Sequence, residues 1–165
     1  MILIPHAIVG AAISSVFSSH PVAGFILAVA SHYLLDMIPH NHYEHKHYII
    51  KETDSIATLS NNIKAIVHLS KIVFDFSIGV FLSILIFTRS WHTLLITLIG
   101  VAGGVLPDFL QYLYFKFKRE PFLSHKKFHD IFENKNNLDH RPALGALIQF
   151  TTTAVIVVVY FIFIK

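Results

Sequence analysis

The sequence predicts an all-α integral membrane protein, a bundle of about five transmembrane helices in a single domain of residues 1–165. Two observations predict this class. Of the 165 residues, 54% are hydrophobic and 14% are charged, whereas about 25% are charged in an average soluble domain. The hydrophobic residues are also gathered into long runs, and roughly 17–25 apolar residues suffice to cross a bilayer as a helix. The surface of such a domain cannot all face water.

Each expected helix is bounded by a change along the chain. A Ser-Ser-His-Pro stretch separates two shorter N-terminal runs, and proline at the first helical position is a common start of a helix. Two longer central runs carry one charge each, and the last run carries none. No Lys or Arg precedes the first run, so it lacks the positive start of a cleaved signal peptide. The expected helices cover about residues 1–18, 21–38, 65–88, 92–115 and 142–164.

The basic residues are shared unequally between the two sides of this bundle. With five spans, the N-terminus and the loops 39–64 and 116–141 lie on one side, which holds all of the 13 Lys and Arg residues except Arg89 and Lys165. Cytoplasmic loops are enriched in Lys and Arg. The sequence therefore predicts a multi-pass inner-membrane protein with a cytoplasmic N-terminus, two cytoplasmic loops and a C-terminus outside. A re-entrant hairpin of residues 1–38 would leave this orientation unchanged.

Histidine and aspartate are concentrated on the predicted cytoplasmic side. In the stretch Ser-His-Tyr-Leu-Leu-Asp-Met-Ile-Pro-His (31–40), His32 and Asp36 are four residues apart and share one helix face. Pro39 should end that helix, so that His40 approaches from another direction. Intramembrane carboxylates cost about 2.5–3.5 kcal/mol and indicate function, and imidazole with carboxylate is the ligand set of catalytic zinc and related divalent metals. We expect a divalent metal site, with zinc as the leading candidate, formed by His6, His32, Asp36, His40, Asp108 and His129.

These motifs also resemble two known families. The His-Tyr-Leu-Leu-Asp-Met-Ile-Pro-His stretch is similar to the H-x-x-x-D…P…H segment of the zinc-dependent phospholipase C and P1 nuclease superfamily. Their combination is more similar to bacterial membrane-bound metal-dependent hydrolase-like proteins, which include the LexA-regulated inner-membrane family. The order of the motifs differs from that family, and the Thr-His-Ser after its His-Arg is missing here. The resemblance implies a metal site and a hydrolase; it rests on Ser31, His32 and Asp36, on Leu106, Pro107 and Asp108, and on His140 and Arg141.

The predicted reaction is metal-assisted hydrolysis of a phosphoester in a lipid or lipid-linked substrate at the cytoplasmic face. A metal lowers the pKa of bound water to near 7 and polarises the phosphoryl oxygen. A spare carboxylate, Asp75 or Asp108, could act as the general base. Membrane lipid is an expected partner, and nucleic acid is not. The basic residues expected to neutralise the substrate phosphate are Lys126, Lys127 and Arg141.

Several alternatives stay open at this point. Asp75 could pair with Lys71, four residues earlier. The protein could bind or transport metal without being an enzyme, or the polar cluster could serve packing alone. The substrate, the identity of the metal and the oligomeric state do not follow from the sequence. A histidine-rich loop could load or sense metal, or could be a solvated loop with incidental metal affinity; its residues are His42, His45 and His47.

Overall fold

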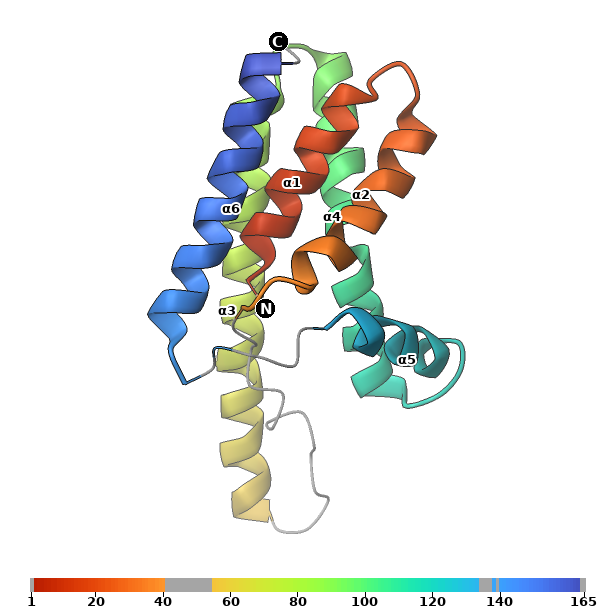
Figure 1. Ribbon diagram of the computed structural model, residues 1–165. Helices are drawn as coiled ribbons and strands as arrows, with labels where there is room; N and C mark the ends of the chain where they lie inside the picture. Colours follow the sequence, from red (N-terminus) through yellow and green to blue (C-terminus); the bar gives the residue numbers. More distant parts are fainter. Residues whose placement is uncertain (1, 41–54, 134–137, 139, 164–165) are drawn as a thin grey trace.

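The computed structural model describes residues 2–40, 55–133, 138 and 140–163, and this part of the chain is all-helical (Figure 1). The predicted all-α class is therefore confirmed. The described part contains six helices and no strand. They are α1 (Leu3–Val16), α2 (Pro21–Asp36), α3 (Ser55–Phe87), α4 (Trp91–Phe117), α5 (Phe122–Phe132) and α6 (Pro142–Phe163).

Three of these helices are long and apolar enough to cross a membrane: residues Leu69–Phe87 of α3, Trp91–Phe117 and Pro142–Phe163. The two N-terminal helices have 14 and 16 residues, about 21 and 24 Å at 1.5 Å per residue. They are shorter than the roughly 30 Å hydrocarbon core. The structure thus supports a membrane protein with three candidate spans, and the five predicted spans are not confirmed.

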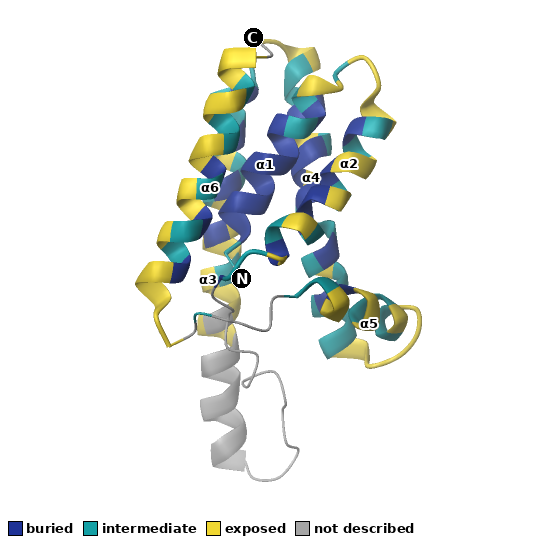
Figure 2. Ribbon diagram, viewed as in Figure 1, coloured by how far each residue is buried: buried dark blue, intermediate teal, exposed yellow. Residues whose placement is uncertain are grey.

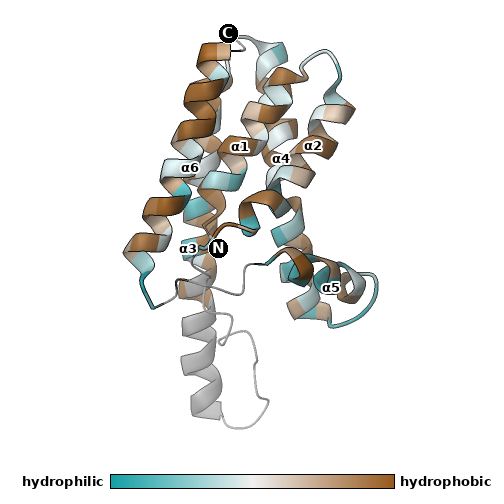
Figure 3. Cartoon of the chain, in the orientation of Figure 1, coloured by the Kyte–Doolittle hydropathy of each residue, from teal (hydrophilic) through white to brown (hydrophobic). Residues whose placement is uncertain are grey.

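α1 lies at the centre of the bundle, where other helices cover it. It contacts α2, α3, α4 and α6, and most of its length is buried (Figure 2). The longer helices instead carry many exposed hydrophobic residues, and α6 is hydrophobic (brown) over much of its length in Figure 3. Large exposed apolar surface on a soluble monomer is rare, so a bilayer is the natural cover for residues such as Phe74, Phe81, Val155 and Ile162.

Glycines bring the backbones of α1 and α4 into direct contact. A side chain at Gly104 would overlap the carbonyl oxygen of His6, and one at Gly100 would overlap the carbonyl oxygen of Gly10. Gly103 gives α2 the same close approach, since a Cβ there would lie 2.8 Å from the carbonyl oxygen of Phe25. Small residues drive helix packing in membranes for this reason. The glycines of α4 therefore fix the positions of both α1 and α2.

The predicted loop 116–141 contains structure that the sequence analysis did not anticipate. α4 ends at Phe117, and the next residue, Lys118, caps it with a left-handed φ of 51°. α5 follows and packs beside the C-terminal end of α4, where it also contacts α2 (Figure 1). Lys, His and Asp interrupt the apolar residues of α5, and this mixed pattern predicts a polar loop. This helix carries one of the predicted metal ligands, as described next.

Candidate metal centre

Side chains from four helices meet at the end of the bundle where α5 lies. α1 contributes His6, α2 contributes His32 and Asp36, α4 contributes Asp108, and α5 contributes His129. Four of the five side chains are buried, and Asp108 is 17% exposed. Residues almost 100 positions apart in the sequence are thus brought within reach of one ion, and these groups could hold a metal.

Three ligand atoms form a nearly equilateral triangle. His32 Nε2, His129 Nε2 and Asp36 Oδ2 are each 3.2 Å from the other two. Ligands bound to Zn²⁺ at 2.0–2.2 Å in tetrahedral geometry lie about 3.3–3.5 Å apart. Asp108 Oδ1 is 3.7 Å from His32 Nε2 and 3.8 Å from His129 Nε2. The three atoms of the triangle are therefore spaced as ligands of one cation, and the Asp108 carboxylate lies beside them.

The orientation of His32 is fixed by the backbone of α4. His32 Nδ1 lies 2.7 Å from the carbonyl oxygen of Gly104. Because a carbonyl can only accept, Nδ1 donates its proton, and Nε2 of the neutral ring keeps its lone pair. That nitrogen faces Asp36 and His129. Metal-binding histidines typically have this second hydrogen bond, which sets both tautomer and ring direction.

Several polar atoms of the cluster have no hydrogen-bond partner among the described residues. They include both carboxylate oxygens of Asp36, both ring nitrogens of His6, and Nδ1 of His129. Buried polar groups in proteins are almost always satisfied, and an uncompensated buried charge costs several kcal/mol. A divalent cation would satisfy a carboxylate and several imidazoles at once. The cluster therefore fits a metal better than it fits a purely structural polar network.

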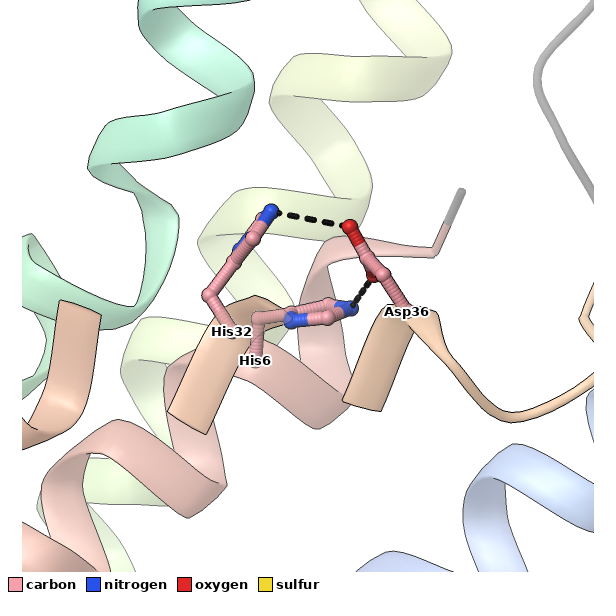
Figure 4. Close-up of side chains that lie close together, drawn as sticks. All are labelled: His6, His32 and Asp36. Atoms are coloured by element: carbon pink, nitrogen blue, oxygen red, sulfur yellow. Dashed lines mark ion pairs between the residues drawn. The ribbon is translucent and has the colours of Figure 1, made fainter. Parts of the chain in front are cut away.

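His6 approaches Asp36 from a different direction than His32 does. Its Nε2 is 3.5 Å from Oδ1 of Asp36, whereas His32 Nε2 is 3.2 Å from Oδ2 (Figure 4). The two rings are tilted by 45°, with centroids 4.4 Å apart. The two oxygens of this single carboxylate thus face two different sets of nitrogens.

His40 lies beside the close cluster rather than within it. Its side chain is buried, and it lines the same cavity as Asp36, Asp108 and His129. α2 ends at Asp36, close to the position expected from Pro39, and the chain then turns. His40 Nδ1 lies 2.7 Å from the carbonyl oxygen of Ile38, so this ring too donates its Nδ1 proton to the backbone.

Asp75 lies against the start of α1. Its carboxylate accepts a hydrogen bond from the backbone N–H of Leu3. A negative charge is favourable at a helix N-terminus, where backbone N–H groups are otherwise unpaired. This bond fixes the first turn of α1, three residues before His6. Lys71, the alternative partner considered from the sequence, has an exposed side chain.

The basic residues predicted to hold phosphate lie outside the buried cluster. Lys126 forms an ion pair with Asp130 on α5, with Nζ 2.6 Å from Oδ1. Lys127 and Arg141 are exposed. The histidines at positions 42, 45 and 47 lie outside the described residues, so the prediction for that loop stays a prediction.

A cavity of about 500 Å³ opens next to the cluster, between α3, α4 and α5. Its volume lies in the range of ligand-binding pockets. Asp36, Asp108 and His129 are at its polar end. The remaining walls are mostly apolar and include Leu69, Val73, Phe76, Val105, Phe109 and Phe115.

Tyr33 and His125 extend the site and were missed by the sequence analysis. The Tyr33 hydroxyl is 3.2 Å from His125 Nε2, and the Tyr33 ring packs edge-on against His32 and His129. Burial, together with the neighbouring His129, lowers the pKa of His125, so this ring is neutral at pH 7. A signal was present, because His125 and His129 are four residues apart and share a helix face. It was overlooked because the segment was expected to be a loop.

The described part of the chain is all-helical, has three helices that could cross a membrane, and carries a buried histidine–aspartate cluster that could hold a metal ion. No family model, curated protein or solved structure matches the chain. The family resemblance drawn from the motifs therefore stays a prediction.

Proposed function

We propose that the protein is a membrane-embedded metal-dependent hydrolase that cleaves a phosphoester in a lipid or lipid-linked substrate. The observation that carries this proposal is the position of the cavity, whose apolar walls lead to Asp36, Asp108 and His129. A hydrocarbon chain would bury its surface along α3 and α4. The phosphate of the same molecule would then lie at the polar end, beside the metal ligands.

In this proposal His32, Asp36 and His129 would hold the metal, which is zinc, with Asp108 beside it, so that one coordination position stays open for water. Bound zinc would lower the pKa of a water molecule and polarise the phosphoryl oxygen. Asp108 is the most exposed of the four and lies farthest from the two histidines. It is therefore suited to accept a proton from the attacking water as a general base. The hydrogen bond from His32 to the Gly104 carbonyl would hold the His32 ring in place during the reaction.

The distribution of buried polar residues favours an enzyme over a transport path. Among the described residues, the buried ionisable side chains all lie near the first turns of α1. In the other half of the bundle, the buried hydroxyls of Ser83 and Thr97 donate to carbonyls of their own helices. A path for ions would need polar groups that continue across the membrane. These hydroxyls offer no such continuous chain.

We also propose that the α5 end of the bundle faces the cytoplasm. The C-terminal end of α6 lies at the opposite end (Figure 1), and a group of basic residues lies on α5 or in the chain that leads into it: Lys116, Lys118, Arg119, Lys126 and Lys127. A reporter that is active only outside the cytoplasm should therefore be active when it is fused after Lys165. A reporter that works only inside should be active when it is inserted between residues 118 and 121. Inactivity of the first fusion in a stably produced protein would overturn the proposed orientation.

Hydrolysis can be tested with the full chain in detergent or nanodiscs. We expect zinc-loaded protein to release product from phospholipids and polyprenyl phosphates, with kcat/KM falling as the hydrocarbon chain is shortened. Asp108→Asn should lower the rate by about 10²–10⁴-fold, because a neutral amide is a poor base. Glu120→Gln is the matched control, since Glu120 is exposed and lies outside the candidate metal-binding groups of the described residues. Equal rates for wild type and Asp108→Asn, or no hydrolysis across the substrate panel, would contradict the proposal.

A further inference from the structure

We infer that the α5 segment, residues 116–132, binds anionic phospholipid headgroups at the surface of the bilayer. Its apolar side chains would enter the outer part of the acyl region, and its basic side chains would contact the lipid phosphates. The inference concerns the surrounding membrane lipid rather than a substrate, so it needs neither bound metal nor hydrolysis. It goes beyond the proposed function and gives a role to basic residues that lie outside the buried cluster.

The length of α4 places the α5 segment at the level of the headgroups. α4 has 27 residues, which is about 40 Å at 1.5 Å per residue. This length is close to the thickness of a bilayer including its headgroups, about 40–45 Å. A membrane-crossing α4 therefore extends its last turns into the headgroup region. α5 packs beside these turns and contacts only α4 and α2 among the described helices (Figure 1), so its outer side is left to lipid or water.

The outer side of α5 carries exposed apolar side chains. Phe128 and Ile131 are three residues apart and share one helix face, and they are 48% and 73% exposed. Phe117, at the end of α4, is 43% exposed. A helix that lies in the membrane surface buries such side chains about 5–10 Å into the boundary between headgroups and acyl chains. These residues would therefore be covered by lipid at the depth that α4 gives them.

Basic side chains accompany this apolar face. Residues 116–132 contain five Lys or Arg residues and two acidic residues, so the α5 segment is positively charged. Lys126 forms an ion pair with Asp130. Basic side chains beside an apolar face attract anionic lipid headgroups. The other four basic residues are exposed and form no ion pair within the described part of the chain: Lys116, Lys118, Arg119 and Lys127.

An aromatic ring holds two of these cations at the edge of the apolar surface. Nζ of Lys116 lies 5.5 Å from the centre of the Phe117 ring, and the guanidinium carbon of Arg119 lies 5.6 Å from the same centre. Both are cation–π distances. The Phe117 ring also stacks on Phe122, the first residue of α5, with centroids 5.9 Å apart. The positive charges are therefore held where apolar and polar surfaces meet, which is where a phospholipid places its phosphate.

A tryptophan on the outer face of α5 reports which lipids touch it. The chain has one tryptophan, Trp91, so Ile131→Trp in a Trp91→Phe background gives a single local probe. The full chain is reconstituted into bilayers that contain either phosphatidylglycerol or phosphatidylcholine with brominated acyl chains, which quench tryptophan fluorescence on contact. We expect quenching by both lipids, with a preference of about fivefold for phosphatidylglycerol, the factor for one basic residue beside an anionic surface.

Replacing Lys118, Arg119 and Lys127 together by Gln should remove most of this preference and leave quenching by phosphatidylcholine unchanged. Arg89→Gln is the matched control, because Arg89 is an exposed basic residue just before the other end of α4, and it should keep the preference. High salt should weaken the preference in the probe protein without any of these substitutions. The test thus remains decisive if the triple variant fails to fold, which circular dichroism would reveal.

Three results would overturn the inference. Absence of quenching by either lipid would show that water or a second copy of the chain covers this face of α5. Equal quenching by the two lipids would show that the basic residues do not select anionic headgroups. A preference that survives both the triple substitution and high salt would have another origin. Each of these results leaves the proposed hydrolase standing, because the measurement reads lipid contact and not turnover.

Discussion

Chelation of the metal should lower the thermal unfolding temperature of the wild-type protein in detergent by about 10 °C. A ligand that binds only the folded state stabilises it by about 4 kcal/mol when its free concentration is 1,000 times the dissociation constant. For a chain of this length, each kcal/mol corresponds to about 2–4 °C. The protein's own geometry adds to the effect, because Asp36 and Asp108 face the same two histidine nitrogens. Without a cation, these carboxylates must repel each other or take up protons.

Asp108→Asn should partly restore the stability of the metal-free protein. The amide has the shape of the carboxylate but no charge, so the apo cluster has less repulsion to accommodate. The same variant should gain less than wild type when zinc is returned, because it has lost a negative charge beside the ion. Glu120→Gln should respond to the chelator as wild type does, since this exposed carboxylate lies outside the candidate metal-binding groups of the described residues. A structural polar cluster would give the opposite pattern: no response to chelator, and a neutral or destabilising Asp108→Asn.

Asp36→Ala should have the largest effect of any single substitution on both metal binding and hydrolysis. Asp36 approaches His6, His32 and His129 together. Its removal leaves the three buried imidazoles without the carboxylate between them, and the remaining ligands bind a metal ion much more weakly. We expect no detectable hydrolysis. Asp36→Asn keeps the shape and one carbonyl oxygen, so it should bind metal weakly while remaining folded. Wild-type activity in either variant would show that the carboxylate serves packing alone.

The part of the site on α2 could be predicted because it depends on local geometry. A spacing of four residues places His32 and Asp36 on one helix face wherever the helix lies in the fold. Pro39 ends the helix for a local reason as well. Asp108 could be singled out as a carboxylate within an apolar run. Each of these inferences needs only the residues within one or two turns.

The contribution of α5 could not be derived in the same way. His129 reaches His32 across 97 positions, and the approach depends on where α4 ends and how the chain turns at Lys118. Neither the end of α4 nor the turn at Lys118 can be recognised from the residues next to it in the sequence. The predicted count of five spans is not confirmed, for a related reason: α1 and α2 are as apolar as the three candidate spans, and length alone separates a short buried helix from a crossing one. The backbone contact at Gly104 explains why α1 can be short, since it is packed inside the bundle.

The most direct test of the central claim is the metal content of the purified wild-type protein, with Asp36→Ala analysed in parallel as the background. Both proteins are supplied with zinc, manganese and iron, freed of excess metal by gel filtration, and analysed per mole of chain. The account predicts at least one equivalent of a divalent metal in wild type and close to none in Asp36→Ala. A folded wild-type protein without metal, or equal metal in the two proteins, would contradict it.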